Sequence, residues 1–406
     1  MKQKQISFDI EDITGKWKKK KSHRYLYRIA CNKEVIRLAY KRMRKGKTKR
    51  FEILEIENNL ESWVEKVQNI LANTKPEGWK SDNPGAAFMP REHYPKIIKE
   101  CGKCRVIYAP DIVELWIQHV IVLVLEPILC RGSYEHSYSS FPGRGSLKGK
   151  QALSRWIRSG DGIRNFAQCD IRHFYDHIKY RTVRQKLEKR IHDRLFLHLI
   201  DVCMTHFPNR APLGFYLSQW LANFLLQELD HDIKQKLGVA HYVRYMDNFT
   251  LSDNSKKKLH AAIRYIKQWL WKHGLKLKGD WQAFRFDYTK KNGKKTGRRV
   301  SAMGWLFYRD RTVLRKHIML HITRVAKRLG KKRESGKKYP ISLCKRLLSL
   351  LGWLKHSDTY DCYLMHVKPY VEIRKIKKII SKNQIKQNRR DLKRARMENR
   401  AVQCAA

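Results

Sequence analysis

The sequence feature that most constrains the fold is a pair of short apolar runs around a polar centre at residues 241–253. Aromatic and β-branched residues flank Tyr245-Met246-Asp247-Asn248 on both sides, and this pattern predicts two strands joined by a tight turn. Asp and Asn at a turn have an ordinary structural explanation, because both tolerate left-handed backbone and cap neighbouring amides. The second explanation is chemical, since a carboxylate at the end of a strand can also bind a cation.

A second aspartate stands in a similar setting. Residues 165–170 form a strand-like run that ends at Asp170, and aromatic residues follow at once. Two strand-end aspartates that a fold brings together make a site for hard divalent cations. Two such cations about 3.5–4 Å apart promote in-line phosphoryl transfer. The pair Asp170 and Asp247 therefore favours metal-dependent phosphoryl transfer over turn chemistry alone.

Taken in order, these motifs resemble the reverse transcriptases of bacterial retroelements. The palm of that family carries one Asp on a first strand and a Tyr-x-Asp-Asp turn on the next hairpin, which Asp170 and residues 245–248 match. Residues 213–219 read Leu-Gly-x-x-x-Ser-Gln, where most of the superfamily has Gln-Gly-x-x-x-Ser-Pro. This form resembles the reverse transcriptases of diversity-generating retroelements. The resemblance covers residues 50–380, nearly the whole chain.

The charge of the chain is strongly one-sided. Lys and Arg number 88 against 37 Asp and Glu, for a formal net charge of +51. Such an excess repels itself and indicates an anionic partner, with nucleic acid the first candidate, whereas a merely solvated surface does not require one sign of charge.

The sequence also indicates a cytoplasmic chain without a membrane partner. The nine cysteines lack the spacing of a disulfide framework, which suits a reducing compartment. No secretory signal is visible at the start. The most apolar run, residues 112–129, contains Glu114 and Glu126, so we interpret it as a core helix and not as a membrane span.

The resemblance implies an α+β fold, the right-hand polymerase with fingers, a ferredoxin-like palm and a helical thumb. The order β-α-α-β-β-α-β across the middle of the chain is the split pattern of such a palm. The expected parts are a basic N-terminal arm (1–32), fingers (33–160), a palm (161–310), a thumb (311–371) and a basic C-terminal tail (372–406). The arm and the tail have two interpretations each, as RNA-contacting elements or as solvated, disordered chain.

Three local expectations concern helices. The apolar spacing after the first aspartate predicts one basic amphipathic helix from Arg181 to about Phe207. Asp176 is interpreted as a helix N-cap. From Thr312 onward the chain is expected to be helical.

The resemblance implies a catalytic centre formed by Asp170, Asp247 and Asn248. Asp170 and Asp247, with the backbone carbonyl of Ile171, are the expected ligands of two Mg²⁺ ions, with Mn²⁺ as the alternative. Asn248 is the main departure from the family, which has a second Asp there. A neutral amide attracts a dication less strongly than a carboxylate, so metal affinity or rate is expected to fall.

The resemblance also implies nucleotide-binding residues. Lys103 and Arg105 are expected to contact the triphosphate, because the arginine fork binds phosphate bidentately; a surface strand with two cations is the alternative. Tyr175 matches the residue that excludes a 2′-hydroxyl, and a core aromatic is its alternative. Lys278 replaces a family Asn, and whether it protonates pyrophosphate stays open. The remaining expected nucleotide contacts are Leu213, Gly214 and Gln219.

Primer and template contacts are expected from two further segments. Residues 139–146 resemble the Gly- and Arg-containing loop of the fingers, with Arg144 over the template. Residues 299–308 resemble the primer-grip hairpin, where Gly304 lets the backbone approach the primer; a buried hairpin end is the alternative. The other expected contacts to primer or template are Ser218, Tyr245 and Met246.

These features predict an RNA-directed DNA polymerase that copies template RNA into cDNA from dNTPs. Leucine at position 213 removes the hydrogen bonds that a glutamine makes in high-fidelity relatives, so low fidelity in a diversity-generating retroelement is expected. A structured non-coding RNA is the expected partner, with an accessory protein or a second copy of the chain beside it. The alternatives are an antiviral-defence reverse transcriptase and a polymerase-derived RNA-binding protein with catalysis impaired by Asn248.

Overall fold

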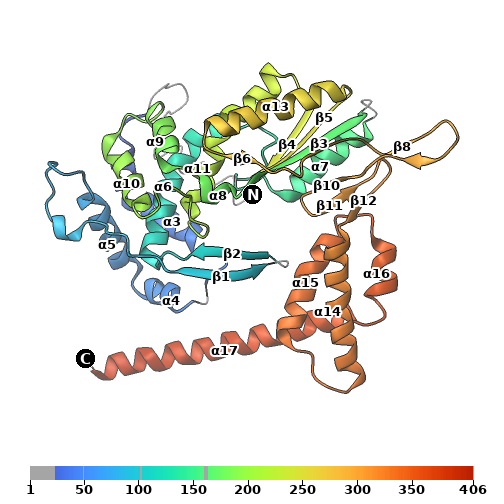
Figure 1. The fold of residues 1–406 in the computed structure, drawn as a ribbon. Coiled ribbons are helices and arrows are strands. Elements are labelled where there is room, and N and C mark those ends of the chain that lie inside the picture. Colours follow the sequence, from blue (N-terminus) through green and yellow to red (C-terminus); the bar gives the residue numbers. More distant parts are fainter. Residues whose placement is uncertain (1–22, 49, 101–102, 160–162, 406) are drawn as a thin grey trace. The chain divides into compact units, whose positions relative to one another are not determined.

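The protein was analysed as a computed structural model that describes residues 23–48, 50–100, 103–159 and 163–405, with backbone alone at 99–100, 103 and 391–405. The chain divides into two compact units (Figure 1). The first unit comprises residues 1–149 and 162–284, and the second comprises 150–161 and 285–406. Residues 1–22 of the expected basic N-terminal arm lie outside the described residues.

An antiparallel sheet forms the centre of the first unit. The strand order is β4-β5-β3-β6, and β7 also pairs with β3. This is the arrangement of a split β-α-β-β-α-β unit, so the predicted order of elements is confirmed. The strands are β3 (Asn165–Arg172), β4 (His241–Tyr245), β5 (Asn248–Asp253), β6 (Lys276–Leu277) and β7 (Gln282–Arg285).

Helix α13 (Lys256–Lys272) lies along this sheet and contacts β3, β5 and β6 (Figure 1). It begins at Ser255, whose hydroxyl accepts from the amide of Lys258 at 3.2 Å, a side-chain cap of the first turn. Its apolar stripe, which includes Leu259, Ile266 and Leu270, is buried. The helix that follows the two paired strands in the predicted order of elements is therefore confirmed, and it covers one face of the sheet that carries Asp170.

The largest helix of the first unit is α6 (Ile112–Arg131). Asp111 caps it by accepting from the amide of Glu114 at 2.8 Å. Among the described residues it is the one helix long and apolar enough to cross a membrane, and 78% of its apolar window is buried inside the protein. That burial is the behaviour of a core helix. It contacts α3 (Lys33–Met43) and α11 (Tyr216–Leu225).

The predicted single helix from Arg181 to Phe207 is wrong, because two helices occupy this segment. Helix α9 (Tyr180–Glu188) ends before Lys189, and α10 (Arg194–Met204) begins after Asp193, whose carboxylate accepts from the amide of Phe196 at 3.0 Å. The cap at Asp193 explains the interruption, since it starts a new helix. Asp176 is not a cap either: it lies inside the short helix α8 (Phe174–His177), which His173 precedes.

The other elements of the first unit complete the helical layer and add a separate hairpin. The hairpin pairs β1 (Pro95–Glu100) with β2 (Lys103–Tyr108), which confirms the strand expected at Lys103–Tyr108. The remaining elements are α2 (Leu26–Ala30), α4 (Phe51–Asn58), α5 (Leu60–Asn73), the 3₁₀-helix η1 (Pro84–Ala86), α12 (Gln227–His231) and the π-helix η2 (Asp232–Lys236).

The second unit joins a three-stranded sheet, β10-β11-β12, and a two-stranded sheet, β8-β9, to a group of helices. Residues Thr312–Leu314 form strand β12, so the expectation of helix from Thr312 is wrong, and the helix begins at Lys316. Besides residues 150–161, the unit comprises the chain from Arg285 onward. Its strands are β8 (Tyr288–Thr289), β9 (Lys295–Thr296), β10 (Val300–Ala302), β11 (Trp305–Phe307) and β12. Its helices are α14 (Lys316–Glu334), α15 (Ile341–Leu354), α16 (Tyr360–His366), α17 (Ile373–Ala405) and the end of α7 (Ser146–Arg158).

The turn between β10 and β11 packs on α15. Gly304 has φ +94°, and a Cβ built on it would lie 2.6 Å from the indole ring of Trp353. The indole rings of Trp305 and Trp353 lie 4.9 Å apart between centroids. The hairpin expected at residues 299–308 is confirmed, and the close approach at its glycine is to a tryptophan of the same unit.

This packing predicts opposite effects for two glycine substitutions. Gly304→Ala should lower the free energy of unfolding by about 1–3 kcal/mol, because the methyl group overpacks the indole and the backbone is left-handed. Gly352→Ala should raise it by about 0.5–1 kcal/mol, because Gly352 lies in helix α15 with no atom within 4 Å of the new methyl group. Urea unfolding of both variants beside the wild type tests this. Equal effects would contradict the packing argument.

Candidate functional site

The β4–β5 hairpin holds Asp247 in a two-residue turn. Tyr245 pairs with Asn248, so the turn consists of Met246 and Asp247, and Asn248 is the first residue of β5. The predicted hairpin is confirmed, although Asn248 belongs to the strand and not to the tip. Met246 has φ 55°, a left-handed backbone that costs a residue other than glycine about 1–2 kcal/mol. The surrounding structure must therefore hold this turn in place.

Strand pairing brings the two predicted aspartates together. Asp170 lies opposite Asn248 in the β3–β5 register, and the amide of Ile171 donates to the carbonyl of Asp247 at 3.1 Å. Burial, followed by the charge of Asp170, raises the pKa of Asp247 to about 6. The two carboxyl groups therefore disfavour simultaneous ionisation, as expected of like charges that share a partly desolvated site.

Each carboxylate accepts a hydrogen bond from a neighbouring side chain. The ammonium group of Lys278 donates to Oδ2 of Asp170 at 2.8 Å, and the side-chain nitrogen of Asn248 donates to Oδ1 of Asp247 at 3.0 Å. The other oxygen of Asp170, Oδ1, is buried without a hydrogen-bond partner. A buried carboxylate oxygen without a donor is unusual, and a bound cation would satisfy it.

The donor set of this centre suits a hard divalent cation. Its ligands are carboxylate and amide oxygens, which Mg²⁺ and Mn²⁺ prefer. Among the described residues no group of three or more His, Cys, Asp or Glu side chains gathers at one point, so the centre offers two carboxylates and no third. Asp170, Asp247 and neighbouring backbone would hold the ion, and Lys278 occupies an oxygen that the ion would use.

Tyr175 lies near this pair. It is partly buried against the core, and burial, followed by the charge of Asp247, raises the pKa of its phenol, while the charge of Arg105 lowers it. Strand β2 therefore places Arg105 within electrostatic range of the tyrosine. Lys103 begins β2, but its side chain lies outside the described part of the structure.

A single loop ties β2 to Tyr175. The amide of Tyr108, the last residue of β2, donates to the carbonyl of Leu213 at 2.7 Å, and the amide of Ala211 donates to the carbonyl of Tyr175 at 2.8 Å. Gly214 has φ +109°, and a Cβ there would overlap the carbonyl of Tyr108. Glycine is thus required at 214 for close approach of two backbones. Leu213, Gly214, Tyr175 and β2 meet in one place.

The other predicted contacts have varied surroundings. Arg144 donates to the carbonyls of Tyr134 and Ser137 and to the hydroxyl of Ser133, so its guanidinium holds its own loop together. Gln219 is exposed and accepts from Ser140 at 3.0 Å. Ser218 is buried, and its hydroxyl has no hydrogen-bond partner.

A buried charged pair, Arg244 and Asp230, lies behind the turn and was not predicted from the sequence. Arg244 and Asp230 have fully buried side chains and form a bidentate ion pair, with nitrogen–oxygen distances of 2.7 and 2.6 Å. Arg244 also donates to the carbonyl of Met246 at 3.0 Å. The available signal was a lone arginine inside an apolar strand, which requires a partner when buried. The partner is 14 residues away and no local pattern identifies it.

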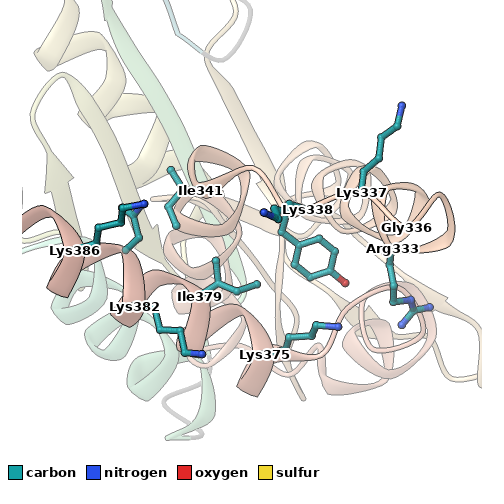
Figure 2. A pocket seen from close by; sticks show the side chains of 11 residues that line it. Arg333, Gly336, Lys337, Lys338, Ile341, Lys375, Ile379, Lys382 and Lys386 are labelled. Carbon is teal, nitrogen blue, oxygen red and sulfur yellow. The ribbon is translucent and has the colours of Figure 1, made fainter.

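The second unit contains a basic groove of about 640 Å³ beside α17, shown in Figure 2. Six of its lining residues are cations and none is acidic. An aromatic ring, Tyr339, and two isoleucines also line it. The cations are Arg333, Lys337, Lys338, Lys375, Lys382 and Lys386. Such a surface suits the phosphates and bases of a nucleic acid strand.

The raised pKa of Asp247 predicts a pH-dependent stability difference. Because its pKa is higher in the folded state, about 6, than the ordinary value of 3.8, the metal-free protein loses stability as pH rises from 4 to 6. Asp247→Asn removes that loss. Above pH 7 in EDTA the variant should be more stable by roughly 2 kcal/mol, a value discounted for solvent access. At pH 4 the difference should vanish. Urea unfolding at both pH values tests this, and a constant difference would exclude the ionisation argument.

Comparison with known proteins supports one conclusion about this region. Residues 94–284 match the family model for reverse transcriptase (RNA-dependent DNA polymerase). The retron Ec73 reverse transcriptase of Escherichia coli is 25% identical over 177 residues, which cover 39% of this chain and 52% of that protein. The chain thus spans about half the length of this relative.

Solved structures give distant likenesses. Telomerase from Candida albicans, in complex with the TWJ fragment of telomeric RNA, has a TM-score of 0.41 and 14% identity, covering 68% of this chain and 56% of that one. Apo telomerase from Candida tropicalis has a TM-score of 0.41 and 11% identity, covering 61% and 52%. The matched region ends at residue 284, where the first unit ends. Residues 94–284, which carry both aspartates and the hairpin, are the part of the chain that matches the reverse transcriptase family model.

Proposed function

We propose that the whole chain is an RNA-directed DNA polymerase, which extends a primer along an RNA template with dNTPs. The observation that carries this proposal is the meeting of Asp170 on β3 with Asp247 in the turn just before β5, with one buried oxygen of Asp170 unsatisfied. The site lies inside a reverse transcriptase domain, and Tyr175 and Arg105 accompany it.

In this proposal Asp170, Asp247 and the backbone carbonyl of Ile171 hold two divalent cations, Mg²⁺ or Mn²⁺. Bound there, such ions supply activation of the primer 3′-hydroxyl and neutralise charge on the leaving pyrophosphate. Asn248 contributes a neutral amide beside Asp247, which lowers the attraction for a dication relative to a carboxylate. Lys278 neutralises Asp170 before a cation enters.

The surrounding residues bind and orient the nucleotide. Arg105, with Lys103, contacts the triphosphate, and the ring of Tyr175 selects deoxynucleotides by occupying the space of a 2′-hydroxyl. The backbone at Leu213 and Gly214 forms one wall of the nucleotide site, because the carbonyl of Leu213 accepts a hydrogen bond from the last residue of β2. Gln219 contacts the nucleotide, and Tyr245, Met246 and Ser218 contact primer or template. Arg144 acts by shaping its loop, since its guanidinium is engaged there.

The units correspond, in this proposal, to the parts of a right-hand polymerase. The sheet of the first unit is the palm and the β1–β2 hairpin belongs to the fingers. Helices α14 and α15 of the second unit form the thumb. Gly304 would act at the primer through the backbone of its turn, because its Cα faces Trp353. The basic groove of Figure 2 provides further contacts to RNA, in keeping with a net charge of +51.

Two biological settings suit this chemistry. The Leu213 and Ser218-Gln219 pattern favours a low-fidelity enzyme of a diversity-generating retroelement, with a structured non-coding RNA as partner. The 25% identity to a retron reverse transcriptase favours another bacterial element, including an antiviral-defence role. Sequencing of cDNA products separates them, since errors concentrated at template adenines indicate the diversifying setting. A third candidate, an RNA-binding protein without catalysis, has its support in Asn248.

Primer extension tests the polymerase and the metal site together. On an RNA template with dNTPs and Mg²⁺, Asp247→Ala should lose at least a hundredfold in rate, because it removes one of two carboxylates. Asn248→Asp should raise the rate or lower the Mg²⁺ requirement, since it adds an ionic ligand. No extension by the wild type, with extension restored by Asn248→Asp, would favour the RNA-binding candidate.

A substitution at Lys278 tests the charge balance of the site without any reaction. Lys278→Asn should tighten Mn²⁺ binding to the protein alone by roughly tenfold, ~1.4 kcal/mol, because the ammonium group no longer competes for Asp170. Lys276→Asn, two residues earlier in the chain and opposite Arg172 on β3, is the matched control for loss of one positive charge. Mn²⁺ titration followed by electron paramagnetic resonance gives both affinities. Equal affinities in the two variants would show that Lys278 does not compete.

A further inference from the structure

The buried pair Arg244–Asp230 lies directly behind the turn that carries Asp247. Both side chains have 0% exposure. A buried ion pair is a weak source of stability, because the cost of removing two charges from water offsets most of their attraction. Stability therefore does not explain the pair, and its function is better inferred from the other hydrogen bonds that Arg244 makes, to Asn223 and Met246.

The arginine binds its acidic partner and the turn at the same time. Two of its nitrogens, Nε and Nη2, bind the carboxylate of Asp230, and the third, Nη1, donates to the carbonyl of Met246 at 3.0 Å. The same Nη1 donates to the side-chain oxygen of Asn223 at 3.0 Å. The planar guanidinium thus links α11 and α12 to the residue immediately before Asp247.

The pair also connects the turn with the loop at residues 139–146. The side-chain nitrogen of Asn223 donates to the carbonyl of Ser139 at 3.0 Å, and the amide of Tyr138 donates to the carbonyl of Arg244 at 2.9 Å. The hydroxyl of Tyr242 donates to the carboxylate of Asp230 at 2.7 Å, a third hydrogen bond beside the two from Arg244. All charged and amide groups of this network therefore have partners, as a buried polar network requires.

We propose that Arg244 is a positioning residue: held by Asp230, it fixes the Met246 carbonyl and thereby places the Asp247 carboxylate beside Asp170 for divalent cation binding. The inference rests on the proposed metal site and adds the residue that sets its geometry. Met246 supplies the reason for such a device, because its left-handed backbone is unfavourable for a residue other than glycine. A bond from a rigid, buried cation keeps the turn in this conformation.

Conservative and charge-free variants separate positioning from folding. Arg244→Lys keeps the positive charge, but one ammonium group cannot reproduce a bidentate bond to Asp230 and a bond to Met246. The double variant Arg244→Met/Asp230→Leu removes both charges and leaves no unpaired ion in the core. Tyr242→Phe is the matched control, because it removes one hydrogen bond of Asp230 and leaves the bond from Arg244 to Met246.

The measurement is Mn²⁺ binding to the protein alone, by electron paramagnetic resonance, beside the thermal unfolding midpoint. Arg244→Lys and the double variant should each bind Mn²⁺ about tenfold more weakly, and Tyr242→Phe should bind as the wild type. If Arg244→Lys does not fold, the Mn²⁺ affinity of the double variant tests the inference. A folded variant that lacks the Met246 bond and binds Mn²⁺ as the wild type does would overturn the inference.

The design distinguishes this inference from the proposed function. Mn²⁺ binding needs neither primer nor template, so a wild type that binds Mn²⁺ through Asp247 without extending a primer would contradict the polymerase proposal alone. The Asp247→Ala variant identifies the ion bound at this centre, because only that portion of the binding should disappear. A wild type without any Asp247-dependent Mn²⁺ binding would overturn both.

Discussion

Two carboxylates, one on strand β3 and one in the turn that precedes β5, are the constraint on which the rest of the site depends. Antiparallel pairing of β3 with β5 brings them together, and burial of Asp247, followed by the charge of Asp170, raises the pKa of Asp247 to about 6. A protein that only needed a stable sheet would gain from an apolar residue at either position. The repulsion is therefore a cost of the site, which neighbouring groups offset locally: Lys278 on one carboxylate and Asn248 on the other.

Rigid elements surround this pair on several sides. The network of Arg244 holds the turn from behind, and the loop at residues 211–214 holds Tyr175 and the end of β2. Gly214 allows that loop to touch the strand without a side chain between the two backbones. These contacts join segments that are far apart in the sequence. A change in any one of these contacts would displace the turn at residues 246–247 or the loop at residues 211–214, because a packed interior transmits displacement.

The sequence predicted those parts of the site that depend on local pattern. Apolar alternation around residues 245–248 identified the hairpin, and the register then places Asp170 beside it. The break between α9 and α10 was missed because the apolar spacing continues across it, and only the cap at Asp193 marks it. The partner of Arg244 could not be found at all, since the pairing depends on how α12 packs behind β4. Gly304 was interpreted as open to a primer, but the neighbour of its Cα is set by the packing of α15.

The two departures from the family pattern at this centre change its charge in the same direction. Asn248 removes a negative charge that relatives carry, and Lys278 adds a positive charge where relatives have an amide. With both aspartates ionised, the centre formed by Asp170, Asp247, Asn248 and Lys278 therefore carries one net negative charge, whereas three carboxylates would carry three. A less negative site attracts free dications less strongly, and it also costs less free energy when no metal is bound. In the proposed polymerase, affinity for the metal would then depend more on the nucleotide, whose triphosphate supplies the missing negative charge. Asn248 and Lys278 together would therefore favour joint binding of ion and nucleotide over binding of the ion alone.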